Sequence, residues 1–213
     1  SQRCRRKNLK LDDKDKELAQ LQLNQGKDKY SEDTLETIVT TNRQIIDYEI
    51  GVELVWHIVQ HYEDAGGILI FLPGAAEISR MIRDLQQGLA AKGADNREFL
   101  ILPLHGALAT KQQQMVFKPP PRGVRKIVVA TNIAETSITV NDIVYVIDFG
   151  KTKEVQYDDG RKLSMLVETF VSQAGAKQRR GRAGRVKPGR CFHISSSHHW
   201  NLLPRHQLPE IQR

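Results

Sequence analysis

Four short apolar runs limit what this chain can fold into. They are ILIFL (68–72), FLILPL (99–104), KIVVAT (126–131) and IVYVID (143–148). Each run is apolar at nearly every position instead of alternating, which is typical of strands buried on both faces. Helical or loop segments separate the runs, and strands that alternate with helices form parallel sheets covered on both sides. The sequence therefore predicts an α/β fold with a mostly parallel sheet.

Helical periodicity marks the segments around these runs. Apolar residues recur at helical spacing from Ile50 to Tyr62, and we expect Gly66 and Gly67 to end that helix. A second helix follows the first strand, and a short one is expected near 110–117. RCFHI (190–194) is typical of a last strand. The apolar face of the second helix consists of Ile78, Met81, Ile82, Leu85 and Leu89.

A β-hairpin is predicted after the fourth run. Asp159 and Gly160 lie between two strand-like arms, and both central residues of such a turn need positive φ, which these residue types tolerate. The hairpin carries several cations, which are Lys151, Lys153, Arg161 and Lys162.

Residues 1–46 are polar and charged, with too few apolar side chains for a core, and we expect a flexible arm, linker or insertion there. One compact domain is expected over 47–213. Cys4 and Cys191 lie far apart without C-x-x-C spacing, which favours a reducing compartment. No apolar run reaches the roughly 20 residues that cross a bilayer, so we expect an intracellular protein, cytoplasmic or nuclear. Its abrupt ends indicate part of a longer protein.

The octet QRRGRAGR (178–185) concentrates positive charge. The chain carries a formal net charge of +7, and no acidic residue lies between Glu168 and Glu210. Arginine presents a planar fork of donors that matches phosphate, so the octet is a candidate anion site. A solvated basic face is the alternative, as for most charge runs. The interleaved glycines favour a backbone held close to a ligand, with Arg182 and Arg185 projecting from one helical face.

Two further loops lie where ligands bind in such folds, at the carboxyl ends of the strands. In LPGAAEI (72–78), the helix N-terminus can receive a phosphate, or the segment is only a tight turn. In ATNIAETSIT (130–139), Glu135 can accept from a sugar hydroxyl or pair with an arginine, and the same residue types also serve capping and turns. The candidate donors to phosphate or ribose are Thr131, Asn132, Thr136, Ser137 and Thr139.

The histidines indicate no metal site. His57 and His61 stand one helical turn apart, but HIVQH lacks the glutamate of H-E-x-x-H, and we expect a structural role. His198 and His199 lie in a polar loop without a nearby acid or cysteine.

Taken in order, ILIFLPGAAEI, PLHGAL, ATNIAETSIT and QRRGRAGR resemble the second RecA-like domain of DEAH-box (DExH) RNA helicases of superfamily 2. The resemblance covers 45–213 and is greatest to the RNA helicase A-like branch. It implies a RecA-like three-layer sandwich with a mostly parallel sheet and a protruding β-hairpin that separates strands. The implied activity is ATP-dependent RNA unwinding.

The resemblance also implies roles for single residues. Gln178, Arg182 and Arg185 match residues that reach the γ-phosphate, the two arginines as arginine fingers. Many relatives have Asp where this chain has Asn141, followed here by Asp142, so this position departs from the family's pattern. The implied nucleotide-binding residues are Phe117, which stacks on the base, Glu135, Thr139 and Asn141. The implied RNA-binding residues are Gly74, His105, Gly106, Thr131, Asn132, Lys151 and Lys153.

The chain contains neither G-x-x-x-x-G-K-[ST] nor D-E-x-H. The phosphate cradle and the carboxylate for Mg²⁺ must then come from a first RecA-like domain, which we expect before Ser1, with winged-helix and later domains after Arg213. ATP, or another NTP, is the implied cofactor and RNA the implied partner, and the isolated chain is expected to be inactive. The alternatives are a non-catalytic RNA- or ribosome-binding module of a degenerate helicase, and a DNA helicase or nucleotide-dependent remodeller.

Overall fold

The computed structural model describes residue 31 and residues 44–207, except 139, 159 and 161. The chain divides into two units, one of which comprises Asp47–Ser195 with His199–Arg213 and contains the sheet. The other comprises Ser1–Ile46 with Ser196–His198. The arm predicted over 1–46 lies almost entirely outside the described residues, so it and the boundary at 47 stay predictions. Cys4, Thr139, Asp159 and Arg161 also lie outside them.

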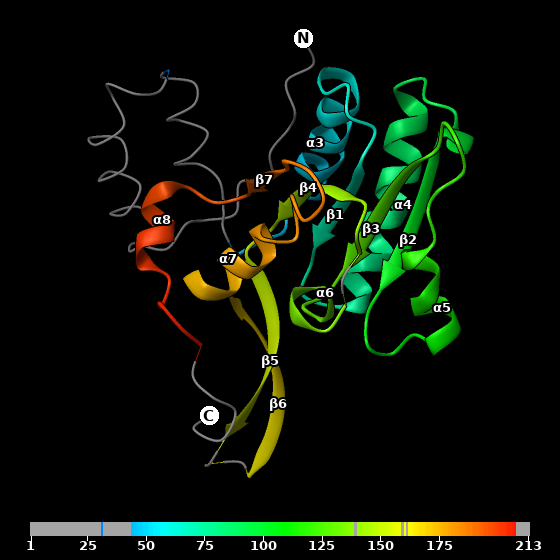
Figure 1. Cartoon of the computed structure of the whole chain (residues 1–213). Helices are drawn as coiled ribbons and strands as arrows, with labels where there is room; N and C mark the ends of the chain where they lie inside the picture. The colour runs from blue at the N-terminus through cyan, green and yellow to red at the C-terminus, as the bar shows by residue number, and fades with distance from the viewer. Residues whose placement is uncertain (1–30, 32–43, 139, 159, 161, 208–213) are drawn as a thin grey trace. The chain divides into compact units, whose positions relative to one another are not determined.

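A five-stranded sheet in the order β2-β3-β1-β4-β7 forms the centre of the described domain, and every neighbouring pair in it is parallel (Figure 1). The predicted parallel sheet is confirmed. All residues of β1 and β4 are buried, as their uninterrupted apolar runs require. The strands are β1 (Gly67–Phe71), β2 (Phe99–Leu104), β3 (Arg125–Ala130), β4 (Ile143–Asp148) and β7 (Arg190–His193).

Helices cover both faces of this sheet. The chain moves in one direction across the sheet from β1 to β2 and in the opposite direction afterwards, so right-handed crossovers place α4 on one face and the later helices on the other. In agreement, α3 packs on α4, and α6 packs on α7. The expected three-layer sandwich is confirmed. The helices are α3 (Tyr48–His61), α4 (Ala75–Ala91), α5 (Thr110–Gln114), α6 (Ile133–Thr136), α7 (Gln173–Arg180) and α8 (Ser197–Leu202), with 3₁₀ turns η1 (Asn96–Glu98) and η2 (Met115–Phe117).

The end of α3 differs from the prediction. The helix ends at His61 and Tyr62 is already extended, whereas Gly67 is the first residue of β1. A Cβ on Gly66 would lie 2.1 Å from a side-chain carbon of Val144. Gly66 therefore allows close approach to β4 and does not end the helix.

The helix predicted over 110–117 is α5 followed by the tighter turn η2. Lys118 is extended, as expected of a residue before proline. Val116 is buried under this segment, whereas the side chain of Phe117 is 50% exposed.

The predicted hairpin is confirmed in its two strands, β5 (Lys151–Asp158) and β6 (Leu163–Phe170), which pair antiparallel. Figure 1 shows the ribbon projecting away from the parallel sheet. Its outer part exposes large apolar side chains, which are Val155, Tyr157, Leu163, Met165 and Leu166.

Candidate functional site

The predicted loops meet at one edge of the sheet. Phe71 at the end of β1 pairs with Ala130 at the end of β3 and with Asp148 at the end of β4. Since neighbouring parallel strands end at the same edge, the segments 72–78 and 130–139 lie side by side there. The end of α7 joins them through the contacts of its last turn.

Arg179 is the centre of this edge, and the sequence analysis did not single it out. Its guanidinium donates to Asp148 Oδ1 (2.8 Å), to the Lys151 carbonyl (3.1 Å) and to Glu135 Oε2 (3.1 Å). The side chain is fully buried and stacks on the Phe71 ring, with 4.9 Å from the guanidinium carbon to the ring centroid. One arginine thus connects the 130–139 loop, the end of β4 and the root of the hairpin.

A sequence signal for Arg179 existed in the spacing of α7. Gly175, Ala176 and Arg179 are the buried residues of this helix, and they recur at three- and four-residue spacing. Two small residues followed one turn later by an arginine indicate a cation that faces inward.

The buried pair of Arg179 and Asp148 is ionised. Burial by itself would raise the pKa of Asp148, but the Arg179 charge and hydrogen bonds from His193 and the Gly150 N–H hold that pKa below its ordinary value. Removing one partner of such a pair costs about 3–5 kcal/mol, because the other charge stays buried. Arg179 is therefore a structural requirement of this edge.

Arg182 is also turned toward its own domain. Its guanidinium donates to the carbonyls of Glu135 and Ile138, both of which belong to the 130–139 loop. Burial, then the charge of Arg185, lowers the pKa of Arg182. The expectation that Arg182 and Arg185 share a helical face is wrong, because α7 ends at Arg180 and Gly181 caps it.

The exposed polar side chains of the octet are those of Gln178, Arg180 and Arg185. Of the four arginines, two are thus used to hold the loops and two point to solvent. The glycines of the octet serve the chain's own turn: Gly184 has φ +87°. A Cβ on Gly189 would lie 2.6 Å from the Gly184 nitrogen and from the Val144 carbonyl oxygen. The close approach that we attributed to a ligand is between two segments of this backbone.

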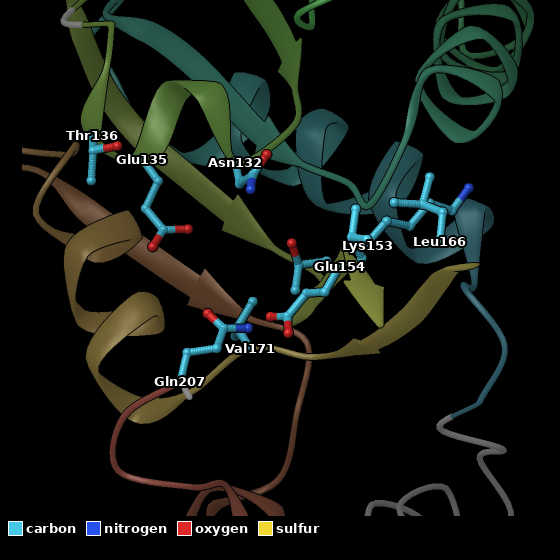
Figure 2. Close-up of a pocket in the computed structure, with 10 residues that line it drawn as sticks. Asn132, Glu135, Thr136, Lys153, Glu154, Leu166, Val171 and Gln207 are labelled. Atoms are coloured by element: carbon cyan, nitrogen blue, oxygen red, sulfur yellow. The ribbon is translucent and has the colours of Figure 1, made fainter. Parts of the chain in front are cut away.

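A pocket of about 250 Å³ lies between the 130–139 loop and the root of the hairpin. Asn132, Glu135 and Thr136 line one side, and β5 contributes Lys153 and Glu154 (Figure 2). Of the two roles predicted for Glu135, pairing with an arginine is the one that the structure contains. Thr131 is half-buried at the start of the loop, and Asn132 and Thr136 are exposed.

The two hairpin lysines predicted to bind RNA are held in ion pairs. Lys151 is 4% exposed and its Nζ lies 2.5 Å from Glu168 Oε1. Lys153 Nζ lies 2.9 Å from Glu77 Oε1. A Cβ on Gly74 would lie 2.8 Å from Lys153 Nζ, so this ion pair covers the N-terminus of α4. RNA binding by these three positions, and phosphate binding at α4, stay predictions.

Of the other predicted site residues, His105 and Gly106 lie at the same edge, whereas Asn141 precedes β4 and lies at the opposite end of that strand. His105 is half-buried and Gly106 exposed after β2, and Asn141 is exposed in the turn before β4. Phe117 lies in η2. His57 and His61 stack with 4.3 Å between ring centroids. No group of His, Cys, Asp or Glu in the described residues could hold a metal ion, and no helix among them is long and apolar enough to cross a membrane.

Cys191, on β7 beside this edge, is expected to be unreactive. Burial, then the charge of Asp148, raises the pKa of its thiol to about 12. At pH 8 we therefore expect native Cys191 to react with iodoacetamide on the order of 10³-fold more slowly than a free cysteine, because the thiolate is the nucleophile. Intact-mass kinetics on a Cys4→Ser variant measure this rate, and guanidinium unfolding gives the reference. Labelling at the unfolded rate would contradict the assigned environment.

The comparisons with known proteins agree with this geometry. The family model described as helicase conserved C-terminal domain matches residues 50–187. The chain is 47% identical over 188 residues to the DExH-box ATP-dependent RNA helicase DExH4, chloroplastic, of Arabidopsis thaliana, covering 86% of the chain and 13% of the relative. It is 48% identical over 185 residues to the ATP-dependent DNA/RNA helicase DHX36 of Homo sapiens, covering 87% and 18%.

Among solved structures, the crystal structure of the E. coli DExH-box NTPase HrpB is similar, with a TM-score of 0.68 and 34% identity. The similarity covers 78% of the chain and 20% of that protein. The chain thus spans no more than about a fifth of the length of the proteins it matches.

Proposed function

Since the chain belongs to the helicase conserved C-terminal domain family, in its DExH/DEAH-box branch, we propose that it is the second RecA-like motor domain of an ATP-dependent RNA helicase. The observation that carries the proposal is that some side chains of the octet bond to its own domain while others stay exposed. Arg179 and Arg182 fasten the octet to the 130–139 loop, and Arg185 and Gln178 remain exposed at the same edge. A cationic turn held this firmly can present charge to a phosphate at a fixed position.

In the proposed mechanism, ATP sits between a first RecA-like domain and this edge. The first domain would hold Mg²⁺ and the β-phosphate, and the described residues contain no cluster that could do so. Arg185 would meet the γ-phosphate with its planar fork and stabilise the charge that develops during hydrolysis. Gln178, in the last turn of α7, would orient the attacking water. Arg182 would join them by exchanging carbonyl partners for phosphate oxygens.

The same loops would transmit hydrolysis to RNA. Arg182 contacts the backbone of the 130–139 loop, whose Thr131 and Asn132 are the proposed contacts to the RNA backbone. Gly74 follows β1, and His105 and Gly106 follow β2. These strands flank β3, which leads into Thr131, so the three residues would extend this contact surface. Movement of Arg182 toward a phosphate would thus alter the grip on RNA, and repeated closure would step the strand through.

DNA unwinding is a second candidate, because one relative at 48% identity is named a DNA/RNA helicase. Unwinding and ATP turnover by the parent protein on RNA and DNA duplexes of identical sequence separate the two. We expect RNA to stimulate turnover at least tenfold more than DNA, and RNA duplexes alone to be unwound. Equal use of both would favour the DNA/RNA reading. ATP turnover that neither polymer stimulates would overturn the motor proposal in favour of a binding module.

A further inference from the structure

We propose that Lys126 is the positioning residue for nucleotide-base recognition, because it fixes η2 so that the Phe117 ring faces the base. The inference rests on the proposed function, in which this domain binds ATP, together with the base contact that the family resemblance implies for Phe117. Lys126 lies on β3, and its side chain is buried inside the domain, away from any bound nucleotide. Its effect on nucleotide would therefore pass through other residues.

The ammonium group of Lys126 is buried and lies close to three oxygen atoms. Its side chain is 1% exposed. Nζ donates to the carbonyl of Val116 (2.7 Å) and to that of Lys118 (2.8 Å), and lies 2.8 Å from Asp142 Oδ2. Two of the three ammonium donors bond to these carbonyls, and the Asp142 carboxylate pairs with the charge. Burying a charge for apolar packing alone would be costly, so the directional bonds account for a lysine here.

The two carbonyls flank Phe117, and the rest of the segment cannot hold this turn by itself. The residues that follow are PPP (119–121), which have no backbone N–H to donate. The one backbone bond that closes η2 runs from the Lys118 N–H to Met115. Val116 points into the core while the Phe117 ring is 50% exposed, so the two carbonyl bonds determine where that ring points.

The third partner, Asp142, links this turn to the segment before β4. Asp142 follows Asn141, an exposed residue that the resemblance implies to bind nucleotide. The Asp142 carbonyl also accepts from the Gly67 N–H at the start of β1 (2.8 Å), which anchors that turn to the sheet. One buried ammonium therefore keeps the base-facing turn and the 141–142 turn at a fixed separation.

A double-mutant cycle in the parent protein tests the inference. We expect Phe117→Ala and Lys126→Met each to raise the KM for ATP about tenfold, in the range of aromatic–base stacking, with kcat changed less than twofold. Because Lys126 acts through Phe117, the double variant should raise KM no more than either single variant. Lys111→Met in α5, where the lysine is exposed, is the matched control and should leave KM unchanged.

Ribose triphosphate, which lacks the base, distinguishes positioning from a general structural defect. Neither Phe117→Ala nor Lys126→Met should change the KM for this compound, whereas a distorted nucleotide site would raise it. If thermal unfolding shows that Lys126→Met does not fold, Lys126→Gln replaces it in the cycle. Glutamine can still donate one bond to a carbonyl, so the expected rise in KM for ATP is smaller.

The contradicting outcomes separate the two proposals. An unchanged KM for ATP in Phe117→Ala overturns the base contact of Phe117, and the inference with it. If Phe117→Ala raises the KM but the Lys126 variant does not, the inference is overturned and the base contact stays intact. The same holds if the two single effects on KM multiply in the double variant.

Discussion

Replacing Arg185 by alanine in the parent protein should lower ATP turnover at saturating RNA on the order of 10³-fold, as loss of an arginine finger does. The side chain is exposed at the edge where the octet meets the 130–139 loop, so its removal leaves the domain's own contacts in place. Arg185→Lys should recover little, because a point charge cannot replace a planar fork that meets two oxygens. RNA affinity without nucleotide should barely change in either variant.

Two other arginines serve as controls for this result. Arg180→Ala removes an exposed charge from the same octet and should keep nearly full turnover. Arg182→Ala should lose turnover as Arg185→Ala does, but should also lower the melting temperature, because the carbonyls of Glu135 and Ile138 lose a donor. If both Arg185 variants keep near-parental turnover and bind RNA more weakly, the octet serves RNA alone.

Removing the outer part of the hairpin should abolish strand separation while RNA-stimulated ATP turnover persists. The change replaces residues 155–166 by a short turn. This region is exposed and carries Val155 and Leu166, which are 55% and 66% exposed, so the sheet does not depend on it. The root must stay, because Arg179 bonds to the Lys151 carbonyl and Lys153 pairs with Glu77.

The hairpin experiment compares duplex unwinding with ATP turnover on single-stranded RNA in the same preparation. A Val155→Thr/Leu166→Thr variant keeps the length of the ribbon and isolates the contribution of its apolar surface. Unwinding by the shortened protein at the parental rate would show that the ribbon is not a wedge. Loss of turnover together with unwinding would show that the ribbon instead supports the nucleotide site.

The strands and the parallel sheet could be predicted because burial on both faces leaves an uninterrupted apolar run, as in β1 and β4. The end of α3 could not. Gly66 and Gly67 have the composition of a helix stop, but Gly66 is required by the close approach of Val144, a residue far away in sequence, and Gly67 already belongs to β1. The apolar pattern thus identified the helix, whereas the role of Gly66 depends on a tertiary contact that the local sequence does not show.

For the candidate site, too, the sequence predicted some features and not others. The sequence indicated loops that the structure brings to one edge, because polar side chains after buried strands gather at one edge of a parallel sheet. It could not say which charges of the octet face inward, because charge alone does not distinguish the buried Arg179 from the exposed Arg180. Likewise, the basic character of Lys151 and Lys153 gave no sign of the carboxylates of Glu168 and Glu77 that pair with them.

The central claim, that this chain supplies one half of an ATPase site, is tested most directly by ATP turnover of the isolated chain at saturating RNA, measured beside the parent protein. We expect the isolated chain to bind RNA weakly and in a salt-sensitive way, since phosphate contacts dominate such binding. Its turnover should not exceed the buffer blank, while the parent hydrolyses ATP in response to RNA. Turnover by the isolated chain above the blank, abolished by Arg185→Ala, would contradict the claim, because this chain would then contain a complete site.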